Sequence, residues 1–115
     1  MIDFTKPNTL YYLPGYTPIA MSMEGLAQLI QSSQCFNSSE TAAYMFCNRD
    51  RNRLRILYWD TQWFLNIIFP IQRGRLQWPA QEGKFTEISL PQLERLLQGD
   101  AIKPTVSSIL SSVKL

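Results

Sequence analysis

The sequence contains no histidine and only two cysteines among its 115 residues. Without an imidazole, the chain cannot form a Ser-His or Cys-His catalytic pair. Cys35 and Cys47 supply too few soft ligands for a structural zinc site. The five glycines are scattered and none begins a Gly-Lys-Ser or Gly-Lys-Thr motif, which argues against a phosphate-binding loop. We therefore expect no metal, no cofactor and no enzymatic activity.

Long apolar runs are absent as well. No stretch approaches the ~20 apolar residues that span a bilayer, and the opening residues Met1 to Phe4 do not resemble a secretion signal. Together with the low cysteine count, this favours a cytoplasmic protein with reduced thiols and no membrane partner.

A strong charge of either sign is also missing, since eleven basic and nine acidic residues give a net charge of +2. An excess this small does not by itself indicate a nucleic-acid-binding protein. The apolar fraction of 45% and the charged fraction of 17% fit an ordinary globular protein. A chain of this length is sufficient for one domain with one core.

Two helices are predicted from their caps and apolar spacing. Ser22 is a candidate N-cap for a helix over 22–33. Four apolar residues follow it at i, i+3, i+4 and i+7, namely Met23, Leu26, Ala27 and Ile30. Ser89 and Gln92 form a capping box for a second helix over 89–99. A third, short helix is predicted over 105–114, where apolar residues recur at helical spacing among serines.

The remaining chain is predicted to be extended. Residues 1–18 contain three prolines, and this spacing indicates an extended arm with one short strand. Residues 44–88 are predicted to form antiparallel strands over 44–47, 53–60, 63–69, 76–78 and 84–88. The fold class expected is therefore α+β: a single domain with an antiparallel meander of about five strands and two or three helices.

A two-residue turn at Thr61 and Gln62 would fix the register of the central hairpin. It places Arg55 opposite Ile68, Leu57 opposite Asn66, and Trp59 opposite Phe64 on one face. The other face collects Leu54, Ile56, Tyr58, Leu65, Ile67 and Phe69. We expect both helices to cover this second face, which leaves Arg53, Arg55 and Trp59 on an outer face.

Arginines gather in two short stretches of the chain. They are Arg49, Arg51, Arg53, Arg55, Arg73 and Arg75, and with Trp59 they define the arginine-aromatic face. Guanidinium groups neutralise phosphates and release counterions, while aromatic rings stack on bases, so this face is a candidate nucleic-acid site. Alternating arginines also protect a solvent-facing strand from aggregation, and Trp59 and Trp78 are better explained as core anchors than as stacking platforms. Both interpretations stay open here.

Acidic residues do not favour a nuclease. Asp60 and Glu94 lack a third converging carboxylate of the kind that metal-dependent strand transfer needs. Asp60 is better explained as a hydrogen-bond acceptor in the hairpin turn, and Gly74 as a residue that permits a positive φ between two arginines.

Several of these segments occur together in a known family. The chain carries Phe46, Asn48-Arg49, "RLRILYWD" at 53–60, Phe64, "RGRLQWP" at 73–79 and then a leucine-rich helix. In this order and spacing they resemble the TnpB-type accessory protein (Orf2) of the insertion-sequence-sixty-six family of bacterial transposable elements. The resemblance extends from about residue 13 to residue 100 and includes the Glu24-Gly25-Leu26-Ala27 helix. It implies a non-enzymatic accessory role in DNA transposition, with element ends, the transposase and a sister accessory protein as partners.

The chain departs from the family pattern in two tetrads. The family's Asp-Met-Arg-Lys is replaced by Pro18-Ile19-Ala20-Met21, and its Lys-Arg-Leu-Glu by Phe69-Pro70-Ile71-Gln72. Ile19, Met21, Phe69 and Ile71 would form an apolar partner-binding patch if exposed. Beside DNA binding, the sequence therefore leaves open an adaptor that binds the transposase, and a degenerate, inactive copy.

Overall fold

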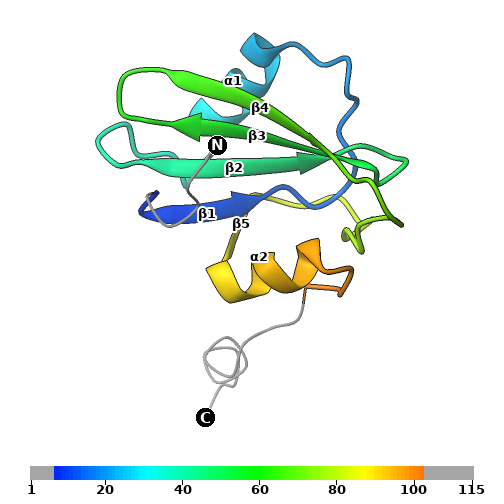
Figure 1. Cartoon of the computed structure of the whole chain (residues 1–115). Coiled ribbons are helices and arrows are strands. Elements are labelled where there is room, and N and C mark those ends of the chain that lie inside the picture. The colour runs from blue at the N-terminus through cyan, green and yellow to red at the C-terminus, as the bar shows by residue number, and fades with distance from the viewer. Residues whose placement is uncertain (1–6, 103–115) are drawn as a thin grey trace.

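Five strands form one sheet with a helix on each side, as Figure 1 shows. The computed structural model describes residues 7–102. The elements in chain order are β1 (Thr9–Tyr12), α1 (Met23–Gln31), β2 (Ala42–Cys47), β3 (Arg53–Trp59), β4 (Phe64–Pro70), β5 (Thr86–Ile88) and α2 (Leu90–Leu97). The third helix predicted over 105–114 lies outside the described residues.

The sheet is mixed, which corrects the predicted antiparallel meander. Its strand order is β4-β3-β2-β1-β5, and only β2, β3 and β4 follow one another as a meander. β1 pairs parallel to β2, with α1 as the crossover between them, and β5 then pairs antiparallel to β1. The segment predicted as an arm, 1–18, thus contributes β1 to the interior of the sheet, because pairing there satisfies its backbone groups and buries Leu10.

The two helices cover opposite faces, and the prediction that both cover one face is wrong. Alternate residues of β2 divide between two cores. Ala42, Tyr44 and Phe46 pack with Leu26 and Ile30 of α1. Ala43, Met45 and Cys47 share the second core with Leu93 and Leu96 of α2. The six-residue apolar run of β2 is buried throughout because the sheet is covered on both sides.

The central hairpin has the predicted register. Arg55 lies opposite Ile68, Leu57 opposite Asn66 and Trp59 opposite Phe64. Asp60 acts as the predicted turn acceptor, since its Oδ1 accepts hydrogen bonds from the backbone N–H groups of Gln62 at 2.8 Å and Trp63 at 3.0 Å. Local turn chemistry is therefore sufficient to set this register.

The strand predicted over 76–78 is absent, although the apolar pattern behind it marks real burial. Leu76 and Trp78 lie in the core beneath α2 without joining the sheet. The indole Nε1 of Trp78 donates to the carbonyl oxygens of Leu13 at 3.1 Å and Gly15 at 3.0 Å. Residues 76–78 are therefore held by their buried side chains and not by backbone hydrogen bonds to a neighbouring strand. Pro79, which follows them, has no N–H with which to form such a bond.

Both helices begin at predicted caps. The Oγ of Ser22 accepts from the N–H of Gly25 at 3.0 Å, and α1 ends at Gln31, slightly inside the predicted range. Ser89 and Gln92 make the complete capping box, with reciprocal side-chain to backbone hydrogen bonds of 3.2 and 2.8 Å.

Candidate nucleic-acid interface

One end of the sheet carries the turn between β2 and β3, which an asparagine organises. The Oδ1 of Asn48 accepts from the N–H groups of Asn52 at 3.1 Å and Arg53 at 3.0 Å. Its Nδ2 donates to the Oδ1 of Asn52 at 2.7 Å. Arg51 adopts a positive φ of 59° within this turn. The turn is thus fixed by its own side chains, which leaves Arg49 and Arg53 exposed and Arg51 half-buried.

The chain that follows β4 packs against this turn. The N–H of Ile71 donates to the carbonyl of Asn52 at 2.7 Å, and the N–H of Leu76 donates to the carbonyl of Arg51 at 2.9 Å. Between these two bonds, Gly74 has the predicted positive φ of 68°. Two arginine-bearing segments that are separate in sequence therefore meet at one end of the sheet, visible where β2 and β4 end in Figure 1.

Five arginines share this end. They are Arg49, Arg51, Arg53, Arg73 and Arg75, and we call them the arginine cluster. Asp50 is the one carboxylate within segments 48–53 and 71–76. Over residues 7–102 the ion pair present joins Arg95 of α2 to Asp100, which follows the helix, so no cluster arginine is paired with a carboxylate there. Glu40 and Asp60 lie at the other end of the sheet, where β2 begins and β3 ends.

Arg55 does not belong to this surface, and the prediction that it lies on an outer face is wrong. It is 7% exposed. Its Nε donates to the Oδ1 of Asn66 at 2.9 Å, while its NH1 donates to the carbonyl oxygens of Met21 and, at 3.5 Å, Ile19. Burial lowers the pKa of the guanidinium. Arg55 therefore fixes the loop before α1 to the sheet instead of meeting solvent.

Trp59 is likewise buried, at 9% exposed, because α1 and the loop after it cover the face that was expected to be open. Its Nε1 donates to the carbonyl of Ser38 at 3.0 Å, and its ring packs on Phe36 and Phe64 with centroids 5.4 and 4.8 Å apart. Of the two interpretations of Trp59 and Trp78, the structure supports core anchoring. The cluster has no exposed tryptophan beside it, so an arginine-aromatic face does not form.

The sequence did contain a signal that this face of the sheet would be covered by a helix. Leu57 and Trp59 share the face of Arg55, and the apolar run of β2 lies beside them. A strand whose residues are apolar on both faces is typical of a sheet covered on both sides. The helix over 22–33 was the element available to cover the second face.

The proposed apolar patch is not formed either. Met21 packs with the core on the α1 side, whereas Phe69 and Ile71 pack with the core on the α2 side. Ile19 alone of the four is exposed, at 41%. The two replaced tetrads therefore contribute mainly to separate cores instead of one partner surface.

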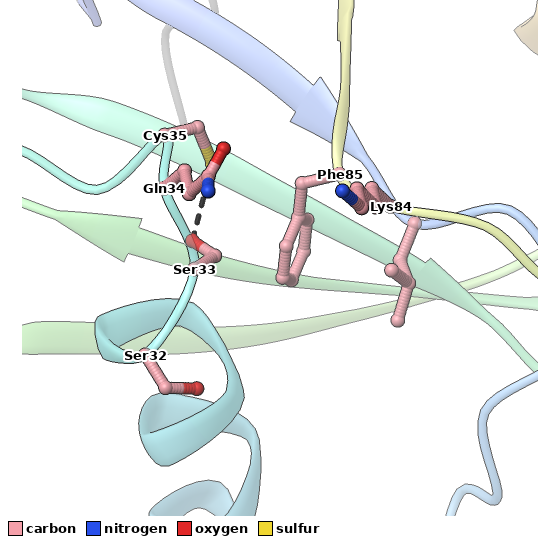
Figure 2. A pocket seen from close by; sticks show the side chains of 7 residues that line it. Ser32, Ser33, Gln34, Cys35, Lys84 and Phe85 are labelled. Atoms are coloured by element: carbon pink, nitrogen blue, oxygen red, sulfur yellow. Dashed lines mark hydrogen bonds between the residues drawn. The ribbon is translucent and has the colours of Figure 1, made fainter.

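A cavity of about 530 Å³ lies beside the C-terminal end of α1, as Figure 2 shows. Residues from three segments line it, including Leu13, Ser33, Cys35, Lys84 and Phe85. The Oγ of Ser33 and the Sγ of Cys35 are hydrogen bonded at 3.2 Å. Lys84 is the one charged residue of the lining, so the cavity brings no acid and base together. Across residues 7–102, no three His, Cys, Asp or Glu side chains gather as metal ligands would.

Comparison with known proteins identifies the family. Residues 8–106 match the family described as IS66 Orf2 like protein. The chain belongs to this family. The prediction made from its motifs is thereby confirmed, and the IS66 Orf2 family links the chain to an accessory role in transposition and to a transposase system.

One curated relative matches the chain over most of its length. The "Uncharacterized protein y4hO" of Sinorhizobium fredii (strain NBRC 101917 / NGR234) is 29% identical over 85 residues, which is 74% of each chain. No solved structure matches this IS66 Orf2 protein. Among residues 7–102, neither helix has the length and apolar character needed to cross a bilayer.

Proposed function

We propose that this IS66 Orf2 protein is a non-enzymatic, cytoplasmic accessory factor that binds DNA at the element ends through its arginine cluster. The observation that supports the proposal is the pair of backbone hydrogen bonds, Ile71 to Asn52 and Leu76 to Arg51, that joins two arginine-bearing segments. Together the two segments carry five arginines and one carboxylate, Asp50. These arginines are concentrated in two short segments even though the net charge of the chain is only +2.

The composition of the cluster favours contact with the DNA backbone. Arginine pairs with phosphate through two parallel hydrogen bonds, and each phosphate neutralised releases condensed counterions. The cluster lies on turns at a strand end and has no exposed tryptophan with which to stack on unpaired bases. We therefore expect salt-dependent binding to duplex DNA, with a slope of up to about −4.5 in log K against log salt if all five arginines contact phosphates.

The non-enzymatic part of the proposal is supported by the side chains of the chain. The sequence has no histidine to act as a base. Burial raises the pKa of the Cys47 thiol to about 11, which keeps this sulfur protonated and unreactive near neutral pH.

The test is fluorescence anisotropy of a labelled duplex from the terminal repeat of the element, titrated with protein at two salt concentrations. The cluster variant is Arg53→Ala with Arg75→Ala, and the control is Lys84→Ala with Arg95→Ala, which removes the same charge from exposed positions elsewhere. We expect the cluster variant to bind roughly tenfold or more weakly, with a salt slope smaller by about 2, and the control to bind nearly as wild type.

Equal losses in the two variants would show that general charge, not the cluster, attracts DNA. If the wild-type protein does not bind the duplex at low salt, the DNA proposal is refuted, and the transposase becomes the first partner to examine by co-purification. Circular dichroism of each variant separates lost binding from lost folding.

A further inference from the structure

β4 is an edge strand that carries no charged residue and has a proline, Pro70, only at its end. It ends the strand order β4-β3-β2-β1-β5, so one side of its backbone has no neighbour in the sheet. Residues 61–72 contain no charged residue, and Trp63, Leu65 and Ile68 are 59%, 46% and 45% exposed. Monomeric proteins commonly protect such edges with charges, bulges or very short strands. The opposite edge follows that rule, since β5 has three residues and carries an exposed glutamate, Glu87.

The hydrogen-bond phase of the hairpin shows which backbone groups of β4 point outward. The N–H of Asp60 donates to the carbonyl of Trp63 before the ladder, and the N–H of Ile71 donates to the carbonyl of Asn52 after it. Antiparallel pairs alternate between hydrogen-bonded and non-hydrogen-bonded. Residues 65, 67 and 69 therefore bond to β3, whereas the N–H and C=O groups of Phe64, Asn66 and Ile68 point away from it.

Pro70 falls on the outward phase of the same alternation. Its lack of an N–H therefore removes no bond to β3, and it limits the outward-facing set to the three residues that precede it. This set of three is symmetric about its middle member, Asn66.

We propose that two copies of this chain associate through β4, paired antiparallel about a two-fold axis at Asn66. Asn66 then pairs with Asn66 of the second copy, and Phe64 with Ile68 of the second copy, so that every outward-pointing N–H and C=O of the three residues is bonded. On the other face, Leu65 packs on Ile67 of the second copy. Apolar side chains meet apolar side chains in the Phe64–Ile68 and Leu65–Ile67 pairs, two asparagines face each other at the axis, and the two sheets join into one.

The charges of the chain favour this antiparallel arrangement over a parallel one. β4 ends near the arginine cluster and begins at the turn that contains Asp60. In the antiparallel register, Gln72 lies opposite Asp60 of the second copy, so each arginine cluster lies beside the acidic turn of its neighbour. A parallel pairing would place the two clusters side by side, where they would repel each other.

The first experiment measures molar mass by size-exclusion chromatography with light scattering, over a range of micromolar concentrations. We expect wild-type protein at twice the 13.3 kDa of one chain. Leu65→Lys and Ile68→Lys put a charge on the edge and should each return the mass to that of one chain. Leu97→Lys is the matched control, since Leu97 on α2 is also 46% exposed, and it should leave the dimer intact.

The second experiment tests the register by disulfide formation in a Cys35→Ser background. Leu65→Cys and Ile67→Cys are purified as separate variants, mixed, and oxidised. Residues 65 and 67 face each other across the proposed interface as a non-hydrogen-bonded pair, within the range that a disulfide can bridge. Cross-linked dimer should form in the mixture and be several-fold less abundant in either variant alone.

A wild-type protein that remains monomeric at the highest concentration overturns the proposal. So does a dimer that survives both edge lysines, or cross-linking that is equal in the mixture and in the single variants. The anisotropy assay for DNA binding compares wild-type protein with the arginine variants and uses no edge lysine, so it fails or succeeds independently of these results.

Discussion

Replacing Arg55 by methionine should destabilise the fold, because this arginine holds the loop before α1 to the sheet. The substitution keeps the unbranched stem and removes the donors to Asn66, Met21 and Ile19. A hydrogen bond to a charged group contributes about 1.5–3 kcal/mol, and a buried acceptor left without a donor adds a desolvation cost. The carbonyls of the loop can regain water once it loosens, so the three losses do not add in full.

We expect a decrease of about 3 kcal/mol in the free energy of unfolding, or roughly 10 to 20 °C in Tm for a domain of this size. Urea and thermal denaturation followed by circular dichroism measure it. Arg53→Met is the matched control, since Arg53 lies on the same strand but is exposed, and its effect should stay within about 0.5 kcal/mol.

The two arginines should also differ in the DNA assay. Below its melting temperature, Arg55→Met should bind the terminal duplex as wild type does, whereas Arg53→Met should bind more weakly. The reasoning is refuted if Arg55→Met is as stable as wild type, or if it abolishes DNA binding while it remains folded.

Three further outcomes follow from buried side chains. Trp78→Phe should cost about 1 to 3 kcal/mol in urea denaturation, because the carbonyls of Leu13 and Gly15 lose their shared indole donor, and an unchanged midpoint would contradict that anchoring. A thiol reagent should label the half-buried Cys35 in native protein and reach Cys47 only after unfolding; rapid labelling of both would contradict the burial of Cys47. Because burial raises the pKa of Cys47 to about 11, its thiol favours the folded state below the unfolded pKa of about 8.5, and this contribution is lost as the pH rises toward 11. The stability advantage of wild type over Cys47→Ala should therefore shrink across that interval, and a constant difference would argue against the shift.

Local chemistry explains the parts of this fold that the sequence predicted well. Ser22 and the Ser89–Gln92 box mark helix starts because unpaired N–H groups at a helix N-terminus need an acceptor nearby. The register of β3 and β4 follows from a turn whose Asp60 accepts two backbone hydrogen bonds. Each of these features depends on residues a few positions apart, so no tertiary information is needed to find it.

The candidate site was predicted only in part, since the sequence supplied the arginines but not their division into two roles. Alternation along β3 grouped Arg53 with Arg55, although one is exposed and the other is buried under the loop that precedes α1. The alternation of residues along a strand predicts which side chains share a face, but it does not predict whether that face is exposed to solvent. That depends on where α1 packs, a contact between distant parts of the chain.

The sequence by itself determined the family, the helix starts and the hairpin register, because these depend on motifs and hydrogen bonds among near neighbours. Only the tertiary structure decided that β1 pairs parallel to β2, that the two helices lie on opposite faces, and that two arginine segments meet at one end of the sheet. The physical reason is that burial of apolar surface is non-directional. An apolar pattern requires covering, and the packing of the whole chain selects what covers it.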